Sequence, residues 1–527
     1  MTDPLTRLAI QYGTDKFGYH DYTPVYFRLL NERREAPLKF LEIGVGGYGD
    51  ADRGGESLMS WRDFFPKGEI VGIDIQKKTL DLGERVTVLQ GSQVDADFLS
   101  ETVREHGPFD IILDDGSHRN EHVIESFKIL WPDLKPDGIY IVEDLQTAFF
   151  PRFGGSLELD EPNSVGYFAE LFQTFDLPDL AGMARFHNIV VLYKTSAPPL
   201  IPGHGEVQTV HAPAAELGEA VRGAVGTAPA DGIVCATSAD ESPAPEIFRT
   251  WFVDVDHREK AVFFPEAESA AEAEGILGLF RTSEGWRVEK GDNTYPSNFR
   301  FESDHPRVIE TFDAMREVLA DSQIEGGLTN FADMLVRADR LDEARPYVER
   351  LLNGEGTSRK FFALGGRVLK EDEKWAEAAS LLERAVERFP DDLGFWINYA
   401  SSLSRSGDEF KAVEALETAA THNPRAAAVR RSLASAMLRV QRVDEAVEQA
   451  ELAVKLNPKN AGFRLFLANL KMRAGEDEEA LGIIQAAISL DPNDPKPHVA
   501  LVGCLSKLGR DAEAGEARQK AEALSQM

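Results

Sequence analysis

Cysteine, clusters of cationic residues and long apolar runs are scarce in this sequence. Its two cysteines, Cys235 and Cys504, exclude a disulfide framework or a cysteine-rich metal site and fit a reducing compartment. No uncharged apolar run approaches the roughly 18 residues of a membrane-spanning helix. The first residues (MTDPLTRLAIQYG) also lack a cationic stretch followed by an apolar core. We therefore expect no membrane span and a cytoplasmic protein.

The charge is strongly negative. Lys and Arg number 57 against 89 Asp and Glu, a net charge of −32. Nucleic acid and anionic membranes bind cationic surfaces, so this charge argues against either as a main partner. A less specific reading is that the charge keeps a long chain dispersed. Hydrophobic residues make up 43% of the 527, enough for packed cores. At roughly 150 residues per domain, we expect about three domains.

Residues 109–147 predict a strand, a helix and a second strand. The strands are the apolar runs Ile111–Leu113 and Ile139–Val142, which are short and unalternating, as is typical of buried parallel strands. Acidic pairs follow both runs, and a histidine follows the first pair: Asp114, Asp115 and His118, then Glu143 and Asp144. Ligands of open α/β sheets bind beyond the carboxyl ends of the strands. We therefore expect four carboxylates and a histidine to converge on one rim, where they would hold a divalent metal.

A glycine-rich turn follows the first predicted strand, Leu38–Ile43. It contains Gly44, Gly46, Gly47, Gly54 and Gly55. A short helix from Ser57 to Phe65 follows, and then a strand, Ile70–Ile75, with Asp74 at its end. Glycines let the backbone approach a ligand closely, and an acid at the next strand end is placed to accept hydrogen bonds from ribose hydroxyls. No P-loop Gly-Lys-Ser/Thr is present. An ordinary strand–turn–helix remains the alternative interpretation.

A third strand, Val86–Gln90, precedes polar residues that include Gln93. These residues are placed to meet the adenine of a ligand bound at the glycine-rich turn. The E-x-G-x-G-G pattern with a downstream acid resembles motifs I and II of class I S-adenosylmethionine-dependent methyltransferases. The alternation of strands and helices predicts a Rossmann-like α/β domain with a doubly wound, mostly parallel sheet over residues 1–197. A last pair of strand-like segments, of which Phe186–Tyr193 is the clearer, ends the domain near Lys194.

Six motifs together resemble the metal-dependent sugar O-methyltransferases of macrolide biosynthesis, of the mycinamicin and demethylmacrocin type. They are GTDK…YTPVY, LEIGVGG, GGESLMSW, GIDI, LDDGSH and EDLQTAFFPRFGG, and the resemblance spans roughly residues 8–195. It implies that Asp115 and Asp144 ligate Mg²⁺ and that His118 is the general base. The residues expected to bind S-adenosylmethionine are Glu42, Gly44, Gly46, Ser57, Asp74, Gln93 and Asp115. The family's long N-terminal oligomerisation domain is missing here, so a homo-oligomer is possible but not implied.

This chemistry agrees with the residues. A sugar hydroxyl is a poor nucleophile, and Mg²⁺, which prefers carboxylate oxygens, can acidify and orient it. A histidine titrates near neutral pH and can accept the proton. The alternative for Asp115, Asp144 and His118 is helix capping. We place His122 outside the metal ligands, and we assign Trp131, Phe149 and Phe150 to the core or a pocket wall.

Two segments carry weaker signals. Residues 13–21 contain Asp15, Lys16, His20 and Asp21, a composition that favours a polar surface loop. Residues 198–322 suggest a linker, a small helix and a small α+β module of unknown role, or a lid. Its expected elements are strands at Thr250–Val255, Ala261–Phe264 and Trp286–Glu289, and an acidic helix over residues 266–280.

A 34-residue repeat occupies residues 323–527. Prolines recur at Pro390, Pro424, Pro458 and Pro492. If proline is position 32, alanine fills position 20 at 344, 378, 412, 446, 480 and 514, and Trp396 stands at position 4. Position 8 is Ala332, Gly366, Ala400, Ala434, Ala468 and Val502. This is the tetratricopeptide pattern, and it predicts about six repeats in an all-α solenoid with a concave groove.

Three functions remain open. The first is an S-adenosylmethionine- and Mg²⁺-dependent O-methyltransferase that acts on a sugar hydroxyl of a glycan or glycosylated metabolite, with a protein or peptide partner in the repeat groove. The second is methylation of a protein that the repeats bind. The third is a non-catalytic scaffold, against which the complete set of acids and the histidine argues.

Overall fold

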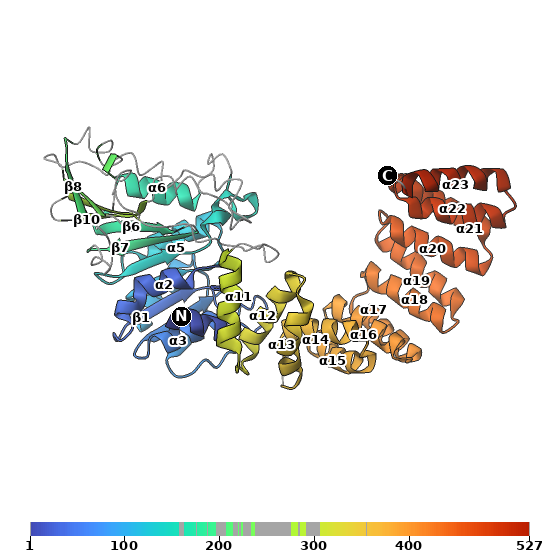
Figure 1. Ribbon diagram of the computed structural model, residues 1–527, viewed down its shortest axis with the longest axis horizontal. Coiled ribbons are helices and arrows are strands. Elements are labelled where there is room, and N and C mark those ends of the chain that lie inside the picture. The colour runs from blue at the N-terminus through green and yellow to red at the C-terminus, as the bar shows by residue number, and fades with distance from the viewer. Residues whose placement is uncertain are drawn as a thin grey trace. The chain divides into compact units, whose positions relative to one another are not determined.

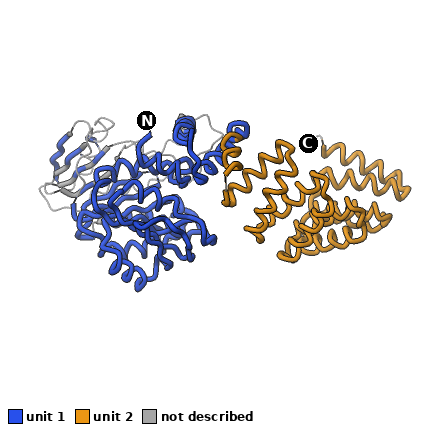
Figure 2. The backbone as a smooth tube through the Cα atoms, turned by 90° about the horizontal axis from the view of Figure 1, so that it is seen from below, with its two compact units in different colours: residues 1–344 blue, residues 345–527 orange. Residues whose placement is uncertain are grey.

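The chain forms two compact units in this computed structural model, residues 1–344 and residues 345–527 (Figure 2). The structure describes residues 2–156, 163–174, 177–186, 188–196, 207–213, 220, 223–224, 233–237, 276–282, 285–290, 306–354 and 356–525. The first unit contains a twisted sheet with helices on both faces, and the second contains helices (Figure 1).

The first seven strands follow the order β3-β2-β1-β4-β5-β7-β6. They are β1 (Lys39–Ile43), β2 (Glu69–Asp74), β3 (Val86–Gln90), β4 (Ile111–Asp114), β5 (Ile139–Val142), β6 (Leu180–Phe186) and β7 (Ile189–Lys194). Strands β1 to β5 pair in parallel, whereas β7 runs antiparallel to both β5 and β6. The predicted Rossmann-like, mostly parallel sheet is confirmed. The last strand was placed wrongly at its start, because Phe186 ends β6 and β7 begins only at Ile189.

Helices cover the sheet on two faces. One core packs strand side chains against α4 (Ala96–His106), α5 (Asn120–Leu130) and α6 (Ser164–Thr174). The other packs them against α1 (Pro4–Tyr12), α2 (Thr23–Leu30) and α3 (Glu56–Phe64). Short 3₁₀ turns η1 (Asn31–Arg33), η2 (Leu145–Phe149) and η3 (Pro151–Phe153) connect elements. Burial on both faces explains why the central strands are uninterrupted apolar runs.

Four strands from residues 198–322 extend the same sheet. They are β8 (Val207–His211), β9 (Ile233–Thr237), β10 (Ile276–Thr282) and β11 (Gly285–Lys290), in the order β6-β10-β11-β9-β8. The strand expected at Trp286–Glu289 is β11. The helix expected over residues 266–280 is wrong at its end, where β10 pairs with β6. The strands expected at residues 250–255 and 261–264 lie outside the described residues.

Helix pairs make up the remainder. After α11 (Pro306–Leu319), the chain forms α12 (Glu325–Arg337), α13 (Leu341–Leu352), α14 (Arg359–Glu371), α15 (Trp375–Arg388), α16 (Leu393–Arg405), α17 (Glu409–His422), α18 (Ala427–Arg439), α19 (Val443–Leu456), α20 (Ala461–Ala474), α21 (Asp477–Leu490), α22 (Pro495–Lys507) and α23 (Asp511–Ser525). The alanines at repeat position 20 are buried, as are five of the six residues at position 8. The position-32 prolines stand just after α15, α17, α19 and α21. The predicted tetratricopeptide solenoid is confirmed.

In the part of the chain that the structure describes, no helix is both long enough and apolar enough to cross a membrane.

Candidate functional site

The site lies where β4 and β5 end. Asp115 and His118 belong to the turn from β4 to α5, and Asp144 begins the turn from β5 to η2. His118 and Asp144 have positive φ angles of 54° and 56°. Backbone in this left-handed region costs about 1–3 kcal/mol for a residue other than glycine, and such strain clusters at functional sites. The backbone of both turns therefore holds these two side chains in orientations that an unstrained loop would not select.

The two acidic pairs each divide between two environments. Asp114 is buried and accepts hydrogen bonds from Ser126 Oγ at 2.5 Å and Gln93 Nε2 at 3.2 Å. Glu143 is also buried and accepts from Lys16 Nζ with both carboxylate oxygens, at 2.8 Å each. Buried partners thus hold Asp114 and Glu143, and the acids that follow them in the turns, Asp115 and Asp144, stay partly exposed at the outer rim. The expected convergence of all four carboxylates is therefore incomplete.

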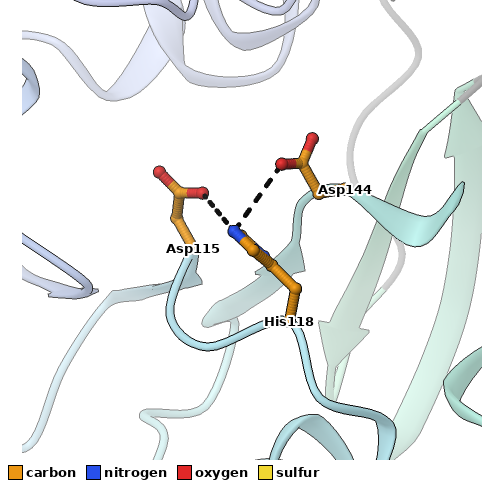
Figure 3. Close-up of side chains that lie close together, drawn as sticks. All are labelled: Asp115, His118 and Asp144. Carbon is orange, nitrogen blue, oxygen red and sulfur yellow. Dashed lines mark ion pairs between the residues drawn. The ribbon is translucent and has the colours of Figure 1, made fainter. Parts of the chain in front are cut away.

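Asp115 and Asp144 face His118 (Figure 3). His118 Nε2 lies 4.0 Å from Asp115 Oδ1 and 3.7 Å from Asp144 Oδ2. One ligand atom from each of the three residues lies within 4.8 Å of the others, as in a possible metal site. The three side chains are 17–24% exposed, so a small molecule in solution has access to them.

These side chains are not helix caps. The N-cap residue of α5 is Arg119, which makes no side-chain cap, so His118 precedes the helix and does not share a helical face with His122. Asp144 stands at the N-cap position of η2, but its side chain does not cap the backbone there. The capping interpretation of Asp115, Asp144 and His118 does not describe the structure.

The surroundings lower the pKa of Asp144 on the rim and raise the pKa of the two acids buried below it. Burial alone would raise the pKa of Asp144, but the His20 and His118 imidazoles and the Tyr22 hydroxyl bring it down to about 2. Burial raises the pKa of Asp114 to about 6 and also raises that of Glu143. A cation on the rim would thus meet Asp144 in its charged form at neutral pH.

The glycine turn meets this rim from β1. Gly44 has a φ of 95°, and a Cβ on it would lie 2.2 Å from the carbonyl oxygen of Asp115. Only glycine lets the two strand ends approach so closely. Gly46 has a φ of 78°, and a Cβ there would find its nearest neighbour at 3.9 Å, on Gly54. The backbone at Gly46 thus has open space beside it.

Glu42 and Asp74, two of the residues predicted to bind the cofactor, accept hydrogen bonds from other parts of the protein. Glu42 is fully buried beneath the turn, and its Oε2 accepts from Ser57 Oγ at 2.9 Å. Burial raises its pKa to about 7, against the opposing effect of Lys16. Asp74 accepts from the Val45 amide at 3.1 Å and the Gln76 amide at 2.8 Å, so it anchors the turn.

The side chain of Gln93 makes hydrogen bonds to the turn that follows β4. Its Nε2 donates to Asp114, and its Oε1 accepts from the backbone amide of Ser117 at 2.8 Å. In this arrangement Gln93 supports the turn that carries Asp115 and His118.

The prediction of a polar surface loop over residues 13–21 was wrong. Lys16 is 2% exposed and Asp21 is 3% exposed. Lys16 Nζ lies 2.6 Å from Asp115 Oδ2, and Tyr22 OH donates to Asp144 Oδ1 at 2.5 Å. Tyr26 OH donates to Glu143. These partners lie 99 to 122 residues away along the chain, so local composition carries no signal for them; the GTDK…YTPVY motif is the one signal that includes them.

Other aromatic and histidine assignments agree with the structure. His122 Nδ1 lies 2.8 Å from Ser117 Oγ, outside the group formed by Asp115, His118 and Asp144. Trp131 and Phe149 are each 2% exposed and belong to the hydrophobic core.

Comparison with known proteins defines the class of each part. Residues 51–145 match the family described as "Methyltransferase domain", and residues 369–436 and 440–498 match "Tetratricopeptide repeat". The chain therefore carries an N-terminal methyltransferase domain and a C-terminal tetratricopeptide region, as the sequence predicted.

Several known methyltransferases are similar to part of this chain. Mycinamicin VI 2''-O-methyltransferase of Micromonospora griseorubida is 39% identical over 208 residues, which cover 36% of this chain and 52% of that protein. An 8-demethyl-8-(2-methoxy-alpha-L-rhamnosyl)-tetracenomycin-C 3'-O-methyltransferase of Streptomyces olivaceus is 39% identical over 209 residues, 36% of this chain and 53% of that protein. A solved structure of the MycE methyltransferase in complex with Mg and SAH has 39% identity and a TM-score of 0.35, covering 38% of this chain and 58% of that one. This chain spans about half the length of the curated relatives it matches.

The donor atoms on the rim suit Mg²⁺. Carboxylate oxygens are its preferred protein ligands. Asp115 Oδ1 and Asp144 Oδ2 both face the space beside His118 Nε2, at 4.0 Å and 3.7 Å from that nitrogen. Asp115 and Asp144 could hold such an ion, with His118 beside it.

Proposed function

We propose that this protein transfers a methyl group from S-adenosylmethionine to a sugar hydroxyl, with Mg²⁺ held by Asp115 and Asp144. The observation that carries the proposal is the approach of two ionisable carboxylates and an imidazole to within 4.8 Å of one another, at the carboxyl end of the sheet. The names of the relatives, which methylate oxygens of glycosylated compounds, support a sugar acceptor.

Each residue has a defined task in this proposal. When bound, Mg²⁺ acts as a Lewis acid that makes a sugar hydroxyl easier to deprotonate. Asp115 and Asp144 would hold the ion beside the acceptor hydroxyl. His118 Nε2, which faces both carboxylates, accepts the proton of the hydroxyl. The open backbone at Gly46 and the turn anchored by Asp74 receive the methyl donor, so that the donor and the acceptor meet in line.

The repeat region has a separate task. We infer that its concave surface binds a protein or peptide partner, since stacked tetratricopeptide pairs present such a surface. The partner brings the enzyme to its glycan or glycosylated substrate. In the alternative arrangement the bound protein is itself the methyl acceptor. Activity on a free sugar acceptor that persists after deletion of residues 345–527 would support the first arrangement.

Substitution of the two aspartates tests the proposal. Asp115→Asn and Asp144→Asn keep the side-chain shape but remove the charges that hold the ion. Loss of several kcal/mol of stabilisation predicts a fall in methyl transfer of at least about 100-fold. Asp133→Asn is the matched control. Asp133 is an exposed aspartate between α5 and β5, at the end of the strands opposite the site. Activity that ignores both aspartates and added Mg²⁺ would refute the metal-dependent mechanism.

A further inference from the structure

The two rim aspartates share an arrangement that the proposed function does not require. Asp115 offers Oδ1 to the side of His118, while its Oδ2 accepts from Lys16 Nζ at 2.6 Å. Asp144 offers Oδ2 to the same side, while its Oδ1 accepts from Tyr22 OH at 2.5 Å. Gln146 Nε2 also donates to Asp144 Oδ1, at the longer distance of 3.3 Å. Each carboxylate thus has one oxygen held from behind and the other directed into the site.

The donors of the two shortest of these hydrogen bonds, Lys16 and Tyr22, come from one segment, residues 13–22 between α1 and α2. Lys16 and Tyr22 are 2% and 3% exposed, and the amide of Tyr22 donates to the carbonyl of Lys16 at 3.0 Å. The Lys16 ammonium is fixed further by both oxygens of Glu143 at 2.8 Å. The Tyr22 ring stacks on His20, with ring centres 4.8 Å apart. The two donors therefore move only if the segment moves.

Helix α12 holds this segment in place. The backbones meet without room for a side chain, since a Cβ on Gly326 would lie 1.9 Å from the carbonyl oxygen of Tyr12 and one on Gly13 would lie 2.2 Å from Gly326. Asn330 Nδ2 donates to the carbonyl of Gly13. Tyr19 OH donates to the Asp333 carboxylate. The first helix of the repeat pattern thus packs on the segment that supplies Lys16 and Tyr22, within the first compact unit.

We propose that residues 13–22, held by α12, are a positioning element that selects which oxygens of Asp115 and Asp144 face the metal. This inference rests on the proposed metal-dependent function. A carboxylate with both oxygens free would rotate or turn away, and the ion would lose a ligand. Partners that orient metal ligands are commonly worth about 10–100-fold in metal affinity. Lys16 and Tyr22 are positioning residues, since the donor of each reaches a metal ligand and not the reacting atoms.

Calorimetric titration of Mg²⁺ into the full chain, without substrates, tests the proposal. Tyr22→Phe removes one hydroxyl and should weaken Mg²⁺ binding about tenfold, with the thermal unfolding temperature unchanged. Tyr19→Phe removes the hydroxyl that meets α12 and should weaken Mg²⁺ binding by less, about threefold. Tyr12→Phe is the matched control, because Tyr12 OH donates to Asp63, a carboxylate that is not at the rim. Its affinity should stay within about twofold of the unsubstituted protein.

The outcomes separate this inference from the proposed function. If the unsubstituted protein binds Mg²⁺, Asp144→Asn abolishes binding and Tyr22→Phe does not change it, the positioning role is refuted and the metal site stands. If Tyr22→Phe weakens binding but Tyr19→Phe does not, the contribution of α12 is refuted. If the unsubstituted protein does not bind Mg²⁺, both proposals fail. A Tyr22→Phe variant that raises the KM for Mg²⁺ but not for S-adenosylmethionine would support the positioning role independently.

Discussion

Replacement of the buried Glu42 by Gln should change how stability depends on pH. Glu42 is fully buried, and burial raises its pKa from 4.5 to about 7. A carboxyl whose pKa is higher in the folded state binds a proton more readily there. Its contribution to stability is therefore present at low pH and is lost as pH rises from 4.5 through about 7. At about 1.4 kcal/mol for each pH unit, the loss amounts to about 3 kcal/mol. Glutamine does not titrate, so this loss should vanish in Glu42→Gln.

Urea unfolding at several pH values between 4.5 and 8 measures the effect. The free energy of unfolding of Glu42→Gln minus that of the unsubstituted protein should rise by about 3 kcal/mol across this range, because other groups titrate in both proteins and cancel. Glu69→Gln is the matched control, since the Glu69 side chain is 69% exposed at the start of β2. A difference that stays constant within about 0.5 kcal/mol would contradict the reasoning from burial.

Three further substitutions test other parts of the account. His118→Asn should lower kcat about 10²- to 10⁴-fold and leave S-adenosylhomocysteine affinity unchanged in a binding titration; equal losses in both would contradict a role as base. Gly44→Ala places a Cβ 2.2 Å from the carbonyl of Asp115 and should weaken Mg²⁺ binding and lower the unfolding temperature, whereas Gly49→Ala, where a Cβ meets nothing within 4 Å, should do neither. Ala412→Leu overfills a fully buried position of the repeats and should cost about 1–3 kcal/mol in a circular dichroism melt, with methyl transfer to a free sugar retained; a loss of that activity would mean that the repeats support the chemistry.

Local pattern was enough for the elements that form the sheet. β3 and β5 lie where the apolar runs predicted them, β1 differs by one residue at its start, and β2 by one residue at each end. Runs buried on both faces have few alternatives, and the glycine turn marks the end of β1. The 34-residue period likewise gave the repeat region, because its alanines must be small for helices to pack. Asp115, His118 and Asp144 come together because parallel strands end at one rim.

Long-range contacts account for the failures. Residues 276–280 continue a helix-like acidic stretch, but pairing of β10 with β6 overrides that local preference. Lys16 resembled a surface lysine because its partners, Asp115 and Glu143, lie about a hundred residues away in sequence. A lysine is seldom buried unless its charge is paired, and nothing near residue 16 shows the distant acids that pair with Lys16.

The dependence of methyl transfer on Mg²⁺ is the sharpest test of the proposed metal-dependent reaction. The full chain, freed of metal with EDTA, would be given labelled S-adenosylmethionine and a panel of activated sugars and glycosides, and Mg²⁺ would be added stepwise. We expect no methyl transfer before Mg²⁺ is added and saturable transfer to at least one sugar hydroxyl afterwards. In Asp144→Asn, added Mg²⁺ should not restore the transfer. Transfer that proceeds equally in EDTA, or that Asp144→Asn does not diminish, would contradict the proposed reaction.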